Sequence, residues 1–586
     1  MVIRRSPPPR PLVPIRAGAL SLLLFVVLPR AEAQMPVLIS SDPAGVPGNG
    51  FCAAGGSSFD GRWVAFSTKA PNLSPNSYEQ VFVKDLATWG LEYVSLSTSG
   101  TPGNDKCTGA RTSWDGRYVA FTGRASNLVA GDLNAALDVF VRDRASGVTT
   151  RESLGSSGLE LNGESFLTDL SVDGRFVLFV SNATNVVPGI ATGQFQPYLR
   201  DRWTGTVLPM AVSNTGALAN GSSFSIAGGV SADGRYVVFP SQASNLVVGD
   251  TNGEEYVFLR DTWANTLIRI SVGPQGEQGD LESKDPYISD DGSVVVFTSS
   301  ASNLVTPDAN GGFADVLVYD LATGGLERVD HTSGGVQADR WAFGQGLSWD
   351  GRFVSFVSDA VNLGQVPELA WDWDAFVYDR VLGTLEQVSP TTPEPELALR
   401  CGISPNGRFA LLQTDQPWVP EHPAGTQQVY AVDRGPICIT PVTYCTGKTN
   451  SLGCDPWVAT YGCASASQDS GFTIYGGNVR NNKQGLLFYG LSGPSATPFQ
   501  GGTMCVAAPR KRTPIRDSFG SSPPANDCSG VWSIDLNEFA AGSGGGHPVG
   551  ALLLPGTLVD CQWWGRDPGA PFQTALSNAI EYLVGP

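Results

Sequence analysis

Histidine is nearly absent from this chain of 586 residues, which contains only His331, His422 and His547. Zinc sites and Ser-His-Asp triads both depend on histidine, so the sequence offers little material for either. It also has no HExxH motif, no phosphate-binding loop, no dinucleotide fingerprint and no Gly-x-Ser-x-Gly nucleophile elbow. We therefore predict that the protein is not an enzyme.

Positive charge is also scarce. The chain has 37 Lys and Arg residues against 55 Asp and Glu residues, which gives a net charge of -18 at pH 7. Such a surface repels nucleic-acid phosphates and anionic membranes, so neither is expected as a partner. Solubility alone would also explain the acidic balance, and a basic partner would fit it.

Long apolar runs are missing except near the N-terminus. There, Arg4, Arg5, Arg10 and Arg16 precede an apolar run over 19–28, and Ala31-Glu-Ala33 fits a cleavage site. The run is too short for a comfortable membrane span. We predict a signal peptide at 1–33, an exported protein (periplasmic, cell-surface or extracellular) and no transmembrane segment.

Glycine is plentiful, with 70 residues, and its placement shows a repeat of about 58 residues that recurs seven times. Each copy opens with a turn of the form Ser-x-Asp-Gly-Arg, first seen at 58–62. Two copies depart from it, with Ser293 in place of the arginine and Asn406 in place of the aspartate. The turn glycines are Gly61, Gly116, Gly174, Gly234, Gly292, Gly351 and Gly407.

Every copy has the same internal order. An alternating strand follows the Asp-Gly turn, then a loop, then a β-branched and aromatic run that ends in aspartate, as at Asp85 and Asp143. A second tight turn and a fourth strand close the unit. Glycine turns between alternating runs indicate hairpins, and four antiparallel strands make one propeller blade.

The ends of the repeat region indicate how a ring would close. The seventh copy has three strands and stops near Pro436, while the segment 37–52 aligns with 93–107, which begins with the fourth strand of the first copy. An N-terminal strand that completes the last blade would remove two exposed edges. We predict an all-β fold with a seven-bladed β-propeller at 34–438; six blades plus a divergent unit is the alternative.

The Ser-x-Asp-Gly-Arg-x-Val-x-Phe pattern resembles the WD40-like repeat of TolB-type and PD40-type bacterial propellers, over roughly 35–436. The resemblance implies the propeller fold. It implies function less directly, because such propellers mostly serve as binding or assembly platforms and some carry a fused hydrolase. TolB itself usually has six blades, so its role and partners are not carried over.

The ten cysteines agree with an oxidising destination, and we expect all of them to form disulfides. Cys52 and Cys107 occupy equivalent positions in neighbouring blades, so we predict that they pair. Cys401 and Cys438 both belong to the seventh blade and are a second expected pair. The remaining six lie in the tail: Cys445, Cys454, Cys463, Cys505, Cys528 and Cys561.

The tail, residues 439–586, has no blade repeat and is predicted to be a small disulfide-stapled β-sandwich. It looks like C-terminal modules of exported proteins from environmental bacteria, for which no activity is established. Trp563 and Trp564 are interpreted as buried beside a disulfide, with a sugar-stacking platform as the alternative. The basic stretch 511–516 is interpreted as a solvated loop.

Three loops between the second and third strands carry spaced oxygen ligands, which suit calcium. Asp and Asn also form Asx turns without any ion, so both interpretations stay open. No cofactor is required by the sequence, and calcium is the one it suggests. The residues are Asp132, Asn134 and Asp138; Asp250 and Asn252; and Asp308, Asn310 and Asp315.

One face of the propeller is expected to carry the ligand. The second-to-third and fourth-to-first connections are long and variable and share this face, which we call the long-loop face. We predict an exported, non-catalytic binding or scaffold protein that binds a protein or an extracellular glycan there. The alternative is a polysaccharide hydrolase or lyase with its site at the propeller centre. The candidate contact residues are Trp341, Trp371, Asp372, Trp373 and Asp374.

Overall fold

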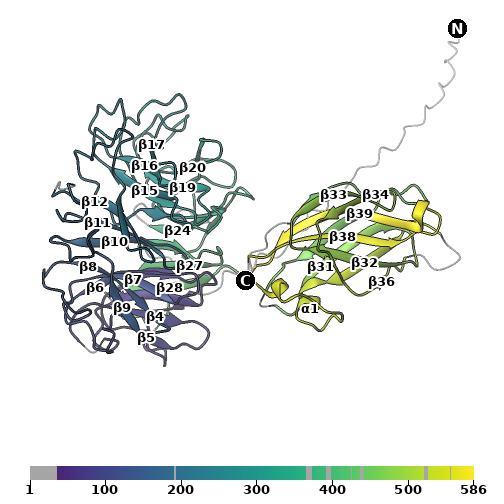
Figure 1. Ribbon diagram of the computed structural model, residues 1–586, viewed down its shortest axis with the longest axis horizontal. Coiled ribbons are helices and arrows are strands. Elements are labelled where there is room, and N and C mark those ends of the chain that lie inside the picture. The colour runs from purple at the N-terminus through teal and green to yellow at the C-terminus, as the bar shows by residue number, and fades with distance from the viewer. Residues whose placement is uncertain are drawn as a thin grey trace, which may run out of the picture.

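The computed structural model describes residues 36–585 apart from 75, 190–192, 365–372, 391–397, 421, 424, 436–440, 467, 521–525 and 555. The predicted signal peptide, Cys438, Trp371 and Asp372 lie outside the described residues. Figure 1 shows two separate bodies, a ring of sheets and a β-sandwich. Within the described part of the chain, helices are short, and none is long and apolar enough to cross a membrane.

Seven antiparallel sheets of four strands each form the blades of the propeller. The first strands, which line the centre, are β2 (Cys52–Ser57), β6 (Cys107–Thr112), β10 (Ser165–Leu170), β14 (Gly229–Val230), β18 (Ser283–Ile288), β22 (Ala342–Leu347) and β26 (Ala398–Ile403). The second strands are β3 (Trp63–Thr68), β7 (Tyr118–Gly123), β11 (Phe176–Ser181), β15 (Tyr236–Ser241), β19 (Val294–Ser299), β23 (Phe353–Ser358) and β27 (Phe409–Thr414).

The two outer layers of strands complete each blade. The third strands are β4 (Gln80–Asp85), β8 (Asp138–Asp143), β12 (Gln196–Asp201), β16 (Tyr256–Asp261), β20 (Asp315–Asp320), β24 (Asp374–Asp379) and β28 (Gln428–Asp433). The fourth strands are β5 (Leu91–Tyr93), β9 (Val148–Arg151), β13 (Thr206–Pro209), β17 (Thr266–Arg269), β21 (Leu326–Arg328), β25 (Thr384–Gln387) and β1 (Val37–Leu38).

The strand β1 closes the ring, as predicted. It pairs antiparallel with β28, with Val37 opposite Ala431 and Leu38 opposite Tyr430. Ile39, directly after β1, is fully buried in the core between blades seven and one. The seventh blade thus takes strands from both ends of the propeller, which confirms seven blades and excludes the six-bladed alternative.

The repeated turn is held by its own polar side chains. Ser58 donates its hydroxyl to Asp60 at 2.6 Å, and Asp60 accepts the backbone N–H of Arg62 at 3.0 Å. Arg62 then reaches the aspartate that ends the third strand, with both bonds to Asp85 at 2.9 Å. Asp85 also accepts the backbone N–H of Ala87 at 2.9 Å. The repeated residues therefore build each blade, and they are not ligand residues.

The turn glycines hold neighbouring blades together. Gly116 has a φ of +67°, and a Cβ there would lie 2.5 Å from the Trp63 ring of the preceding blade. Gly292 meets Tyr236 in the same way at 2.9 Å. A side chain at this position would be strained and would push the blades apart, which explains why each copy of the turn keeps its glycine.

The predicted bridge between Cys52 and Cys107 is wrong, because both are free and buried. Equivalent residues of adjacent blades point the same way around the ring, so the sheet of blade one stands between them. Cys52 packs in the core between blades seven and one, and Cys107 in the core between blades one and two. Cys401 is also free, so its predicted bridge to Cys438 is wrong as well.

The tail is a disulfide-stapled β-sandwich, as predicted. Its larger sheet contains β29 (Val442–Tyr444), β39 (Thr574–Leu583), β38 (Leu558–Arg566), β32 (Gln484–Gly490), β35 (Lys511–Arg512) and β36 (Arg516–Asp517). The smaller elements are β30 (Trp457–Gly462), β31 (Phe472–Val479) and β37 (Gly530–Asp535), the hairpin of β33 (Pro494–Phe499) and β34 (Gly502–Val506), and the helices α1 (Leu536–Ala540), η1 (Gly550–Leu553) and η2 (Pro571–Gln573).

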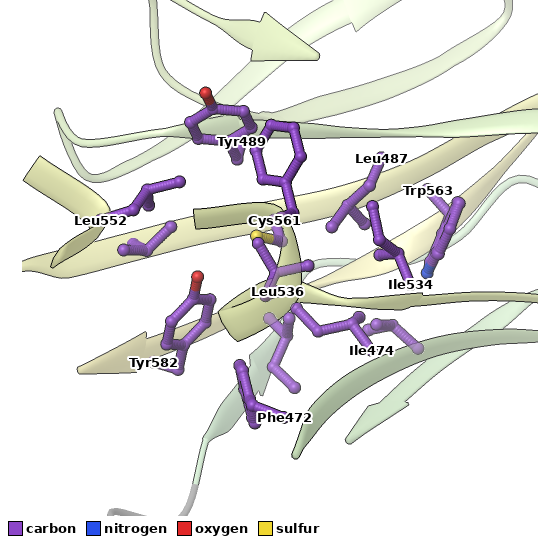
Figure 2. Close-up of a cluster of buried hydrophobic side chains, with 14 of the residues drawn as sticks. Phe472, Ile474, Leu487, Tyr489, Ile534, Leu536, Leu552, Cys561, Trp563 and Tyr582 are labelled. Carbon is purple, nitrogen blue, oxygen red and sulfur yellow. The ribbon is translucent and has the colours of Figure 1, made fainter. Parts of the chain in front are cut away.

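Two disulfides are seen in the sandwich, Cys445–Cys505 and Cys454–Cys528, and Cys463 is also disulfide-bonded. Cys561 departs from the prediction because it is free. Figure 2 shows it inside the core, among Tyr489, Leu536 and Tyr582. Trp563 is fully buried and stacks on Trp532 at 5.8 Å, so it is a core residue and not a sugar platform. The cysteine beside it, Cys561, is a free thiol and not part of a disulfide.

Candidate functional site

An aromatic row lies on the long-loop face of blades five and six. Trp341 stands just before β22 and stacks on Phe343 of that strand, with ring centroids 6.1 Å apart and planes 10° apart. Phe343 stacks on Trp373, which stands just before β24, at 5.5 Å and 21°. Phe313 meets the other side of Trp341 edge-on at 5.3 Å. We call these four rings the first aromatic group.

The structure joins two of the sequence-predicted contact residues, Trp341 and Trp373, through Phe343, which the sequence reasoning missed. The sequence feature that could have identified Phe343 is an aromatic residue at the second position of a first strand, next to the long-loop end of the central channel. We call this end of the channel the rim. Asp374 has another role: it is buried and accepts hydrogen bonds from Ser389 and Gln387 of its own blade. It anchors β24 and does not face a ligand.

A second aromatic group occupies the matching place in blades three and four. Phe166 of β10 lies 5.8 Å from Phe195 and 5.5 Å from Phe224, and Phe195 lies 4.7 Å from Phe224. Phe166 and Phe195 hold the same positions in blade three as Phe343 and Trp373 hold in blade six. Phe224 is 46% exposed, so an apolar surface faces solvent here.

An acidic cluster lies between the two aromatic groups, in blades four and five. Glu255 stands before β16, and burial together with the nearby Glu282 and Asp285 raises its pKa to about 7. Lys284 pairs with Glu282 at 2.5 Å, and Arg400 lies within electrostatic reach of Asp285. Asp285 has a φ of +52°, which is a strained backbone for a residue with a side chain. The local potential is negative despite the lysine and the arginine.

The first strands of all seven blades surround a central cavity of about 190 Å³. Its lining is uneven. The residue two places before the turn serine is glycine in four blades, at Gly56, Gly229, Gly346 and Gly402, and the other three blades carry Arg111, Asp169 and Tyr287. The charged groups therefore depend on individual blades and are not part of the repeat.

Variable residues from four of the repeated turns, Trp114, Val172, Asp290 and Pro405, form the floor of this cavity. Trp114 is the centre of the floor: its ring lies 4.6 Å from Phe59 and 6.2 Å from Trp349. Backbone bonds link the turns of neighbouring blades, as from Phe59 N–H to the Trp114 carbonyl at 2.8 Å. Asp290 accepts the Trp114 indole N–H at 3.1 Å. Burial, with Asp169 nearby, raises the pKa of Asp290 to about 7.

The predicted calcium loop of blade two brings three carboxylates together. One oxygen from each of Asp132, Asp138 and Glu160 lies within 4.8 Å of the others. Arg151 of β9 occupies the same space, 2.6 Å from Glu160, 3.4 Å from Asp138 and 3.7 Å from Asp132. Burial and the neighbouring Asp138 raise the pKa of Asp132 to about 6. The Asn134 amide donates to the Leu161 carbonyl at 2.9 Å and to Asp138 at 3.3 Å.

The loops of blades four and five repeat this arrangement. Arg328 of β21 lies 2.9 Å from Asp315 and 3.9 Å from Asp308. Arg269 of β17 interacts electrostatically with Asp250. Asn252 and Asn310 each donate to a backbone carbonyl, at 3.0 Å. An arginine thus supplies positive charge at each predicted site, so calcium would have to displace it, and calcium binding at these loops stays a prediction.

No family model and no curated protein matches the sequence. Solved structures similar to this chain include oligogalacturonate lyase from Vibrio parahaemolyticus, at 14% identity and a TM-score of 0.40, with 69% of this chain and 98% of that chain covered. TolB from Acinetobacter baumannii is another, at 16% identity and a TM-score of 0.31, with coverages of 64% and 80%. Both are TolB-like propellers. At these values the likeness carries no argument about activity, and the seven blades rest on the sheets described above.

Proposed function

We propose that this is an exported, non-catalytic binding protein whose long-loop face binds a protein through a basic segment. The observation that carries the proposal is the order of groups around the rim of the channel. Two half-exposed aromatic groups, in blades three and four and in blades five and six, flank the acidic cluster of Glu255, Glu282 and Asp285. Extracellular glycan is the other ligand class that the aromatic groups would suit.

The chemistry of the rim favours a basic peptide. Aromatic side chains are the most frequent hot spots of protein interfaces, and truncating one costs about 2 kcal/mol or more of binding. Burial, and then the neighbouring Glu282 and Asp285, raise the pKa of Glu255, and a cation bound beside these carboxylates would offset their mutual repulsion. A lysine or arginine between two apolar side chains meets both features at once. The net charge of -18 would speed its approach.

Export is supported by the tail. Its disulfides Cys445–Cys505 and Cys454–Cys528 require an oxidising compartment. In most organisms the cytosol is reducing, so these disulfides support export. The predicted signal peptide agrees with this. Together they support a function outside the cytosol, where proteins and glycans of the cell surface are both available.

The test is fluorescence anisotropy with two labelled tetrapeptides, one with two lysines between two tryptophans and one with glutamates in place of the lysines. We expect the mature protein to bind the basic peptide and not the acidic one. Trp341→Ala and the double variant Glu255→Gln, Glu282→Gln should each weaken binding at least tenfold. Trp263→Ala is the matched control, because Trp263 is 67% exposed on the opposite face.

Equal affinity for both peptides, or no effect of Trp341→Ala, would overturn the proposal for a basic partner. A chito-oligosaccharide and an uncharged glucan oligomer form a further arm of the same assay. Binding of either one with loss in Trp341→Ala would make a glycan the ligand. Release of shortened products from those oligomers would make the protein an enzyme.

A further inference from the structure

The central cavity has a chemistry of its own, separate from the rim. It lies on the propeller axis above Trp114, which packs against Phe59 and Trp349. Its volume of about 190 Å³ is close to that of a cavity of roughly 150 Å³ that holds a benzene molecule. A ligand of this site therefore has a handful of non-hydrogen atoms.

Two arginines that line the cavity have a carboxylate within electrostatic reach, Asp169 for Arg111 and Asp285 for Arg400, but neither forms a close ion pair among the described residues. Arg111 makes one side-chain hydrogen bond, to the Ala110 carbonyl at 3.1 Å, and Arg400 is exposed and makes none among the described residues. Neither takes part in an ion pair in the described part of the chain, whereas most arginines of the propeller do. Guanidinium groups stay charged and bind carboxylates with two parallel bonds.

Acceptors for a cation share the same cavity. Asp169 accepts one backbone N–H, from Val230 at 3.0 Å, and keeps further acceptor capacity. Asp290 lies on the floor near it. Tyr287 stands among these charges and is within electrostatic reach of Arg111, Arg400 and Asp169. The site thus offers donors for an anion and acceptors for an ammonium or hydroxyl group within one small volume.

The fold does not require these side chains. The position of Arg111, Asp169 and Tyr287 is occupied by glycine in the other four blades. The position of Arg400, four places before the turn serine, is occupied by Gly109 and Gly344 in blades two and six. Blades form without any side chain at these places, so a blade does not require the charged residues, although Asp169 links blade three to Val230 of blade four.

We propose that the central cavity binds a small α-amino acid, with its carboxylate held by Arg111 and Arg400 and its ammonium group held by Asp169. The claim does not depend on the rim as a protein-binding surface. The ligand belongs to the class of free zwitterions that fit a cavity of this size.

The experiment is isothermal titration calorimetry of the mature protein with glycine and L-alanine, the smallest members of the class. We expect saturable binding of at least one of them at millimolar concentration or below. Acetate lacks the ammonium group and methylamine lacks the carboxylate, so each should bind at least tenfold more weakly. The ethyl ester of the bound amino acid, which has lost the anion, should also bind at least tenfold more weakly.

Variants assign the residues. Arg400→Gln and Arg111→Gln should each weaken amino-acid binding at least tenfold, because each removes a charge-assisted contact. Arg124→Gln is the control, since Arg124 pairs with Glu164 outside the cavity. Thermal unfolding checks that the variants fold, and Trp341→Ala should keep the site intact, which separates this proposal from the rim. No saturable binding of either amino acid, or full binding in both cavity arginine variants, would overturn it.

Discussion

Loss of β1 should open the propeller ring, and the size of the effect can be worked out from the structure. Ile39 is fully buried between blades seven and one, and truncation of such an isoleucine to alanine costs about 2–5 kcal/mol. Deletion of 34–41 also removes the bond from Ile39 N–H to the Val429 carbonyl at 2.8 Å and the bond from Ser40 to Gln428 at 2.6 Å. At about 1 kcal/mol for each of these two hydrogen bonds, the total loss is about 4–7 kcal/mol.

The assay is hydrogen exchange with mass spectrometry on the strand β28, which pairs with β1. A loss of about 4–7 kcal/mol corresponds to exchange that is roughly a thousandfold faster or more. Ile39→Ala should show a smaller increase, and Val37→Ala almost none, because Val37 is 36% exposed. Strand β12, inside blade three, serves as the internal control. The deletion variant should also aggregate, because it exposes two strand edges.

One result would refute this reasoning. If β28 in the deletion variant exchanged at the rate of the wild type, the seventh blade would be held by its other three strands alone. The pairing of Val37 with Ala431 would then be incidental to closure.

Three further predictions concern the cysteines, the cavity floor and the loop arginines. Alkylation in denaturant without reductant should label four cysteines: Cys52, Cys107, Cys401 and Cys561. Alkylation of the native protein should not label them, because burial raises the pKa of these thiols. Rapid labelling of the native protein would contradict their burial. Burial raises the pKa of Asp290 from its ordinary value near 4 to about 7, so its contribution to stability is complete below pH 4 and is lost as the pH rises through 7. The melting temperature should therefore fall more steeply from pH 5 to 8 in the wild type than in Asp290→Asn. Equal slopes in the two proteins would count against a buried neutral Asp290. Calcium should raise the melting temperature of Arg151→Gln more than that of the wild type, because Arg151 occupies the space among the carboxylates; no shift in either protein would remove the metal interpretation.

The blades were predictable because their signals are local. The hydrogen bonds of a turn such as 58–62 lie within five consecutive residues. Its glycine indicates a positive φ, which few other residues adopt. Ring closure was predictable because an incomplete seventh copy and an unpaired N-terminal strand fit together. The sandwich was predictable in kind, from short strands and clustered cysteines.

The partners of individual side chains were less accessible. Cys52 and Cys107 align in the repeat and point the same way around the ring, so the sheet of blade one separates them into different cores. Arg151 follows Asp132 and Asp138 along the chain, and no sequence pattern predicts that it contacts them. The pairing of β8 with β9 brings these residues together. Both outcomes depend on the side to which a strand turns each residue, and a one-place shift reverses that side.

The sequence by itself determined the number of blades, their strand order and the closure of the ring, because the same pattern of strands and turns occurs in seven copies. Only the tertiary structure decided which unlike residues meet. Arg111, Asp169, Tyr287 and Arg400 come from four blades far apart in the chain. They share a cavity because the ring turns every first strand toward one axis, and no local pattern in the sequence records that shared direction.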